Sequence, residues 1–145
     1  MMLIELDWNK GVAFTAKARQ FTLQLDEPES FHGDDTGPSS AEYLGVSVGG
    51  CLGTSFAYCA KHVDLPLKAI KITMDVEVHH EDGDGSGGKG PLRITGVKAD
   101  IAVTLQNDDD ADVLDLCIES FKKYCVVTQS VMRGIPVDVK ITKHC

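Results

Sequence analysis

A chain of 145 residues is long enough for a single domain with a substantial hydrophobic core, which we expect over residues 1–145. Its 22 acidic and 14 basic residues give a formal net charge of −8, which argues against a nucleic-acid backbone or an anionic membrane surface as partner. The chain starts MMLIELDWNKG and lacks the basic start and apolar core of a signal peptide, so a cytoplasmic protein is expected.

The N-terminal part of the chain predicts antiparallel strands. Apolar and polar residues alternate over residues 3–8 and again over residues 12–25, with a turn at Asn9-Lys10-Gly11 between them. A second turn near residues 17–20 would divide the longer stretch into two strands. Residues 26–39 are rich in Asp, Gly, Pro and Ser, which predicts a long surface loop.

The most informative segment is the apolar run over residues 40–63, which we predict to be a buried central helix. Only Glu42 carries a charge before Lys61, so the helix should be buried on most sides. Its serine, threonine and glycine content makes it too polar for a membrane span. Each glycine in the run costs a helix about 0.5–1 kcal/mol relative to alanine, so a sheet or a second copy of the helix should pack closely against them. These glycines are Gly45, Gly49, Gly50 and Gly53.

The second half of the chain predicts two strands, two helices and a last strand. The strands are expected over residues 70–78 and 92–105, joined by a loop over residues 81–91, because apolar and polar residues alternate in both. Helices are expected over residues 110–124 and 128–132, and the final strand over residues 137–141. Runs of strands separated by helices indicate the α+β class.

The cysteines show no pattern typical of a metal or disulfide module. There are five, at positions 51, 59, 117, 125 and 145, with no C-x-x-C pair among them. This spacing indicates neither a zinc module nor a disulfide scaffold, and no metal or other cofactor is expected. Cys117 is expected in the core. Cys59 either packs in the core or serves as an alternative partner for Cys51.

Three segments carry a resemblance to a known family. The runs SAEYLGVSVGGCL, LRITGV and YCVVTQSVMRGIPVDVKI resemble the OsmC/Ohr family of thiol-dependent hydroperoxide reductases, and the loop DEPESFHGDDTGPSSAEYL is similar to its OsmC-like branch. The resemblance covers nearly the whole chain. It implies an OsmC-like α+β fold, an intertwined homodimer in which antiparallel sheets wrap around buried central helices.

The resemblance also implies a catalytic site. In the family, the cysteine matching Cys51 attacks the peroxide and becomes a sulfenic acid, and the cysteine matching Cys125 resolves it as a disulfide that a dithiol reductant reopens. The attacking sulfur must be a thiolate although burial raises a cysteine pKa, so a nearby cation is expected. The family uses an arginine oriented by a glutamate. Glu42 matches the glutamate, Lys10 falls near the arginine position, and Arg19 is the only N-terminal arginine.

Glu42 and Cys51 are separated along the predicted helix. Nine residues of helix span about 13 Å, so Glu42 could serve Cys51 only across an antiparallel pair of helices in a dimer.

Three functions are compatible with these residues. The first is cysteine-dependent reduction of organic hydroperoxides, in protection against oxidative or osmotic stress. The second is a non-catalytic OsmC-like module that binds a small molecule or partner, or senses oxidants. The third, by analogy of fold alone, is a thioesterase of the hot-dog type with Glu42 as its carboxylate.

Overall fold

The computed structural model describes residues 1–82 and 88–144. The chain divides into two units that share three long elements, which are helix α1 (Ser40–His62) and strands β4 (Leu67–His80) and β5 (Leu92–Leu105). The first unit contains the described residues of 1–47 and 74–99, and the second those of 48–73 and 100–145. The mixture of antiparallel strands and helices confirms the predicted α+β class.

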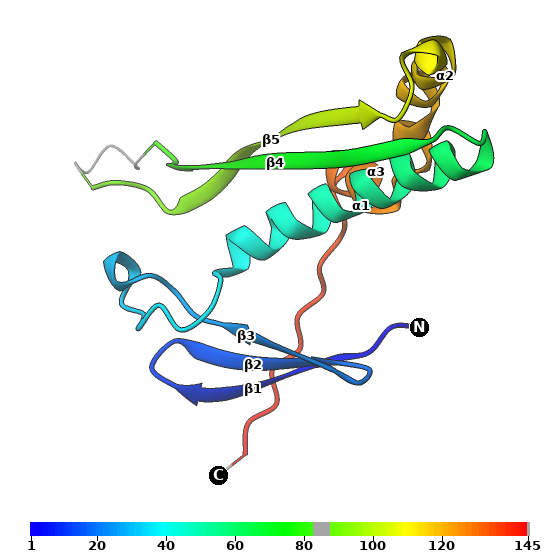
Figure 1. Cartoon of the computed structure of the whole chain (residues 1–145). Helices are drawn as coiled ribbons and strands as arrows, with labels where there is room; N and C mark the ends of the chain where they lie inside the picture. Colours follow the sequence, from blue (N-terminus) through cyan, green and yellow to red (C-terminus); the bar gives the residue numbers. More distant parts are fainter. Residues whose placement is uncertain (83–87, 145) are drawn as a thin grey trace. The chain divides into compact units, whose positions relative to one another are not determined.

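A three-stranded antiparallel sheet forms the start of the first unit (Figure 1). Its strands are β1 (Ile4–Lys10), β2 (Ala13–Ala18) and β3 (Phe21–Leu25), in that order. Gly11 takes a φ of 53° in the first turn, where glycine is favoured. Arg19 takes a φ of 56° in the second. Both predicted turns are confirmed, the second without a glycine or proline to mark it.

The loop that follows is organised by one buried carboxylate. Asp26 is only 3% exposed and accepts hydrogen bonds from the Thr36 hydroxyl at 2.7 Å and from backbone N–H groups of Glu27, Asp34 and Thr36. The hydroxyl and N–H groups of Thr36 do most to lower the pKa of Asp26, to about 2, because they stabilise the charged form. The predicted surface loop is therefore ordered by its own polar groups, with a short 3₁₀ turn, η1 (Glu29–Phe31), inside it.

Helix α1 begins at a reciprocal cap. The Ser39 backbone N–H donates to Glu42 Oε2 at 2.7 Å, and the Glu42 N–H donates to Ser39 Oγ at 3.3 Å, which is a capping box. One face of the helix is buried and the opposite face is exposed, with Tyr58 72% exposed. The expectation of burial on most sides is therefore wrong for the single chain, because only one side of α1 is covered within it. The buried residues are Gly45, Val48, Gly49, Leu52, Phe56 and Ala60.

Two of the helix glycines pack against β4. A Cβ on Gly45 would lie 2.9 Å from Val76 Cγ2, and a Cβ on Gly53 would lie 2.8 Å from Ile72 Cδ1, both too close for a real contact. A Cβ on Gly50 would meet nothing within 4 Å. The expected close approach of a sheet is thus confirmed at Gly45 and Gly53, where β4 supplies the neighbouring atoms.

The second unit continues from the β4–β5 pair into a run of short helices. They are η2 (Asp108–Asp110), α2 (Ala111–Ser120), η3 (Phe121–Tyr124) and α3 (Val126–Arg133). The predicted helix over residues 110–124 is therefore present as α2 followed by the 3₁₀ turn η3. The ring of Phe121 packs edge-on against Phe56 of α1, with centroids 5.3 Å apart, and fixes η3 against α1.

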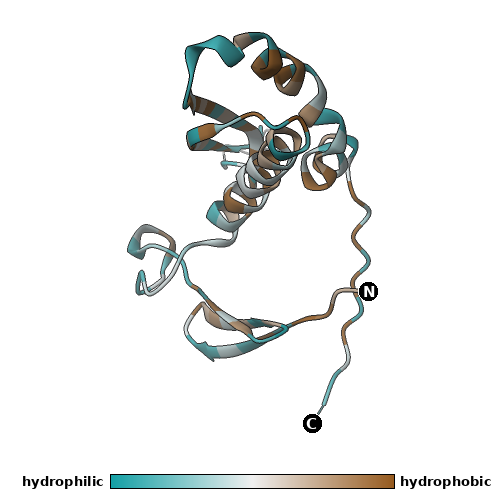
Figure 2. Cartoon of the chain, turned by 45° about the vertical axis from the view of Figure 1, so that its right-hand side comes forward, coloured by the Kyte–Doolittle hydropathy of each residue, from teal (hydrophilic) through white to brown (hydrophobic). Residues whose placement is uncertain are grey.

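The predicted last strand is not formed. Residues 134–144 are extended without ladder partners, and their apolar and polar residues alternate along the trace in Figure 2. Val137 and Ile141 are 84% and 90% exposed. A strand needs a neighbour for its backbone hydrogen bonds, and the described part of the chain supplies none to this segment.

Two further predictions concern loops and membranes. Of the loop predicted over residues 81–91, residues 83–87 lie outside the described residues; at its ends Glu81 accepts a backbone hydrogen bond from Gly90. Within residues 1–82 and 88–144, no helix has the length and apolar character needed to cross a bilayer.

Candidate active site

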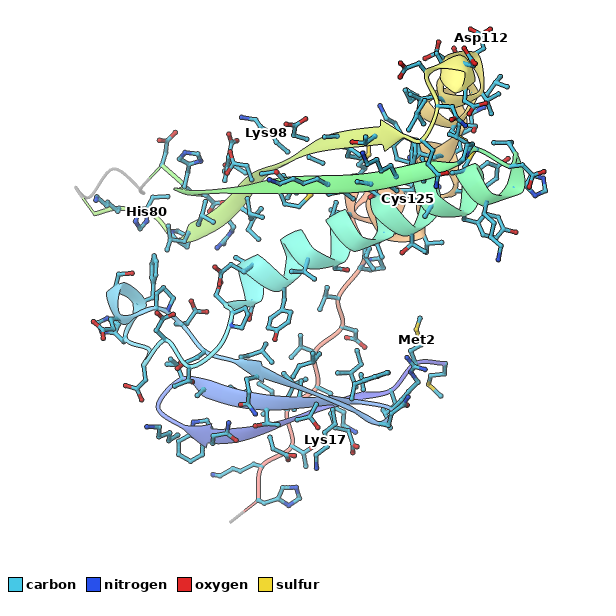
Figure 3. All side chains as sticks on the ribbon, viewed as in Figure 1. Met2, Lys17, His80, Lys98, Asp112 and Cys125 are labelled. Atoms are coloured by element: carbon cyan, nitrogen blue, oxygen red, sulfur yellow. The ribbon has the colours of Figure 1, made fainter. Side chains whose placement is uncertain are left out.

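Two cysteines meet in the second unit. Cys51 lies at the middle of α1, next to the buried Leu52, and is itself half-buried. Cys125 is fully buried at the position that precedes α3 (labelled in Figure 3). Two residues after Cys125, the Val127 N–H lies 3.4 Å from the Cys51 sulfur. The structure thus brings together the two cysteines that the resemblance had paired.

The first turn of α3 points N–H groups at Cys51. The helix starts after Cys125, whose ψ of 96° is extended, and the first intrahelical bond runs from the Gln129 N–H to the Cys125 carbonyl at 3.0 Å. The N–H groups before Gln129 have no partner within the helix. One of them, on Val127, donates to Cys51 Sγ at 3.4 Å. The Cys51 sulfur therefore occupies the anion position of a helix N-terminus.

These donors decide the ionisation of Cys51. Burial alone raises the pKa of this thiol, because it disfavours the charged form. Hydrogen bonds from the Cys125 thiol, from the Val127 and Thr128 N–H groups and from the Ser55 hydroxyl outweigh burial, so the pKa lies below its ordinary value. The arrangement favours the thiolate, which is the reactive form of cysteine.

The proton of Cys125 has two acceptors. The Cys125 thiol donates to Thr128 Oγ1 at 2.8 Å. It also stabilises the Cys51 thiolate as a hydrogen-bond donor. A thiol has a single proton, so Cys125 can turn from the Thr128 hydroxyl to Cys51 when Cys51 ionises.

The other predicted site residues lie in the first unit. Lys10 pairs with Asp34 at 3.0 Å, and both side chains are exposed; the hydrogen bond and the charge of Asp34 raise the pKa of Lys10. Arg19 lies in its turn with its guanidinium 5.1 Å from the centre of the Phe21 ring. Glu42 is engaged in the capping box of α1. A role for these three residues at Cys51 stays a prediction.

Sequence reasoning missed the groups that lower the pKa of Cys51. We expected a cation, whereas the second unit supplies backbone N–H groups of Val127 and Thr128 and the hydroxyl of Ser55. Position 125 lacks the Ser, Thr, Asp or Asn typical of a helix cap, so nothing in the sequence marked this helix start as a donor site. The available signal was Ser55, one helical turn after Cys51 and hence on the same face.

A metal site does not emerge from the described residues. Across residues 1–82 and 88–144, no three His, Cys, Asp or Glu side chains are grouped as metal ligands. His79 Nδ1 lies 2.6 Å from Thr95 Oγ1, and His80 Nδ1 donates to the Gly90 carbonyl at 2.7 Å. Both histidines are exposed, and each has a hydrogen-bond partner at one end of the β4–β5 pair.

Comparison with known proteins identifies a family that matches most of the chain. A family model described as OsmC-like protein matches residues 33–140, which include Cys51 and Cys125. No curated protein matches the sequence. Several solved structures share the fold at low sequence identity.

Three of these structures are the following. An OsmC-like protein from Mycoplasma pneumoniae has 17% identity and a TM-score of 0.67, and the match covers 93% of this chain and 89% of that one. An organic hydroperoxide resistance protein OsmC from Legionella pneumophila has 15% identity and a TM-score of 0.63, with coverages of 92% and 90%. An OsmC-like hydroperoxide resistance protein from Jannaschia sp. CCS1 has 13% identity and a TM-score of 0.58, with coverages of 98% and 91%. Identities this low establish the fold alone.

Proposed function

The chain belongs to the OsmC-like protein family, and on that premise we propose that it is a thiol peroxidase that reduces organic hydroperoxides through Cys51 and Cys125. The observation that carries the proposal is the contact of the Cys51 sulfur with the first turn of α3, which follows directly after the buried Cys125. A peroxidase needs a thiolate with a second thiol beside it, and the lowered pKa of Cys51 and the nearby buried Cys125 support this proposal.

The reaction follows from this geometry. The Cys51 thiolate attacks the outer oxygen of the hydroperoxide, the O–O bond breaks, and the alkoxide takes a proton to leave as alcohol. Cys51 is now a sulfenic acid. The Cys125 sulfur then attacks the Cys51 sulfur, the S–OH bond breaks, and the hydroxide leaves as water with the Cys125 proton. A dithiol reductant restores both thiols by exchange and becomes a disulfide itself.

Peroxide consumption by cysteine variants tests the proposal. With excess dithiothreitol, the parent protein should reduce cumene hydroperoxide repeatedly, and Cys51→Ser should lose this rapid reaction. Cys125→Ser should leave Cys51 as a sulfenic acid that dimedone traps. Cys145→Ser is the matched control and should behave as the parent. A Cys51→Ser variant as fast as the parent would refute the proposal, and a parent whose Cys51 does not react would favour the non-catalytic binding module.

We further propose that the protein works as a homodimer. The first unit leaves large apolar side chains of its sheet exposed, with Trp8 65% and Phe21 51% exposed. In the second unit, the segment 134–144 has the alternation of a strand but no ladder partner in the described chain. A structure of this dimer would show whether Lys10, Arg19 or Glu42 lies at Cys51. It would also show whether residues 1–145 fold as a single domain. Light scattering that shows a monomer at micromolar concentration would contradict this.

A cytoplasmic location is part of the same proposal. The reaction needs Cys51 and Cys125 to be returned to thiols after each cycle, which a reducing compartment favours.

A further inference from the structure

A second pair of thiols lies in the second unit, on the part of α1 that follows Cys51. Cys59 is half-buried, and its sulfur lies 3.6 Å from Ser120 Oγ of α2. Cys117 is three residues before Ser120 and therefore on the same face of α2, and it is fully buried. The Ser120 contact thus holds the Cys59 sulfur against the face of α2 that carries Cys117. Both are free thiols.

Cys59 also lines a cavity. The cavity measures about 590 Å³, within the range of small-molecule sites, and all its lining residues belong to the second unit. Tyr58 and His62 line it from α1, with their rings stacked, and Phe121 and Tyr124 line it from η3. Aromatic walls favour a reactant with an apolar part, and the His62 imidazole can supply a proton to a leaving group.

We propose that Cys59 and Cys117 are a second redox-active pair, in which Cys59 reacts with an organic hydroperoxide admitted to this cavity and Cys117 resolves it. The Cys59 thiolate attacks the outer peroxide oxygen, the O–O bond breaks, and the alkoxide leaves as alcohol after protonation. The Cys117 sulfur then attacks the Cys59 sulfur, and the sulfenic hydroxyl leaves as water with the Cys117 proton. One hydroperoxide and two thiols thus yield one alcohol, one water and one disulfide.

The surroundings of the two thiols differ, and the difference fits an attacking Cys59 and a resolving Cys117. Burial, the hydrogen bond to Cys59 and the charge of an ionised Cys59 raise the pKa of Cys117 to about 12. Cys59 lines the cavity and can meet a reactant there, while Cys117 is fully buried. Oxidation of Cys59 removes its charge, which takes away one of the causes that keep Cys117 protonated.

This pair works separately from Cys51 and Cys125. Eight residues of helix place Cys59 about 12 Å beyond Cys51, too far for direct exchange between the pairs. Cys51 accepts a hydrogen bond from an N–H group in the first turn of α3, whereas the hydrogen-bond partner of Cys59 is the Ser120 hydroxyl. We therefore expect oxidation of Cys59 to be at least about tenfold slower than that of Cys51 at neutral pH.

The test uses a variant that keeps only the second pair. Cys51→Ser, Cys125→Ser and Cys145→Ser together leave Cys59 and Cys117 as the only cysteines. With one equivalent of cumene hydroperoxide, both thiols should disappear, and trypsin should release the peptides 20–61 and 99–122 joined by a disulfide. The added change Cys117→Ser should leave Cys59 as a sulfenic acid trapped by dimedone. Hydrogen peroxide should react more slowly than cumene hydroperoxide.

A second measurement needs no variant. Digestion of the oxidised parent with trypsin and chymotrypsin cleaves after Phe56 and Tyr58 and so separates Cys51 from Cys59. A Cys59–Cys117 bond should appear after the Cys51–Cys125 bond as peroxide is raised. Recovery of Cys59 as a sulfinic acid with Cys117 reduced, or of both thiols unreacted under excess peroxide, would overturn the second pair. Neither result bears on the Cys51–Cys125 reaction, because that disulfide is identified separately through the peptide that carries Cys125.

Discussion

Removal of the Cys125 thiol should make Cys51 a weaker acid as well as leave it without a resolving partner. The Cys125 S–H stabilises the Cys51 thiolate as a hydrogen-bond donor, so Cys125→Ala should raise the pKa of Cys51. Cys125→Ser removes the sulfur but keeps an O–H at the same place. It should therefore abolish disulfide formation while the pKa of Cys51 stays low.

The size of the effect follows from the strength of one hydrogen bond to a charged group. Such a bond contributes about 1.5–3 kcal/mol, and the weak S–H donor belongs at the lower end. About 1.4 kcal/mol corresponds to a factor of ten in the thiolate population. At pH values below the pKa, Cys51 in Cys125→Ala should therefore react with iodoacetamide about tenfold more slowly than in Cys125→Ser.

The assay follows alkylation of Cys51 as a function of pH. Cys59→Ser and Cys145→Ser form the background for all variants, so that tryptic peptide 20–61 carries Cys51 as its one cysteine. Ser55→Ala provides a second donor deletion, since the Ser55 hydroxyl also lowers the pKa of Cys51. Equal pH profiles for Cys125→Ala and Cys125→Ser would show that the Cys125 thiol does not stabilise the Cys51 thiolate.

Two further predictions concern stability. Asp26 has a lowered pKa of about 2, so its contribution to stability is complete above its unfolded value of 3.8 and is lost as the pH falls through about 2. The stability of Asp26→Asn, measured by thermal unfolding, should therefore depend less on pH between these values than the stability of the parent. Equal losses of stability in the two proteins would exclude this role of Asp26. Gly50→Ala should stabilise the protein by about 0.5–1 kcal/mol, since its Cβ meets nothing within 4 Å. Gly45→Ala should destabilise it, because its Cβ meets Val76, and denaturant unfolding that ranks the two variants in the opposite order would contradict both assignments.

The elements of the fold that depend on local pattern could be predicted from the sequence. The central helix over residues 40–63 is α1 with its end moved by one residue, and the strand over residues 92–105 has the predicted bounds. Both have long, regular apolar periodicity, which is the strongest signal in a single sequence. The predicted strand over residues 137–141 has the same kind of pattern but is not formed. Alternation predicts which side chains share a face, but it cannot supply the neighbouring strand.

The site was harder to predict than the fold. The pairing of Cys51 with Cys125 came from the family resemblance, since they lie 74 positions apart in the chain and no spacing rule connects them. The backbone donors to Cys51 could not be foreseen, because every residue except proline has an N–H group and only the fold decides where it points. The sequence argument required a positive charge near Cys51. The partial positive charge of a helix N-terminus meets the same need without a basic side chain.

The surroundings of the two thiol pairs bear on the order in which they oxidise. Cys51 and Cys59 belong to one helix, but only Cys51 faces the N–H groups of another helix, while the raised pKa of Cys117 comes from burial and from Cys59 itself. Reaction with a peroxide requires the thiolate, and the N–H donors of α3 favour the thiolate at Cys51, so the first pair should react first. At a higher peroxide level the slower pair can follow. The order of the two reactions is therefore set by the hydrogen-bond donors around each sulfur. A variant that removes a donor to Cys51, such as Cys125→Ala, should slow its reaction and bring the two rates closer together.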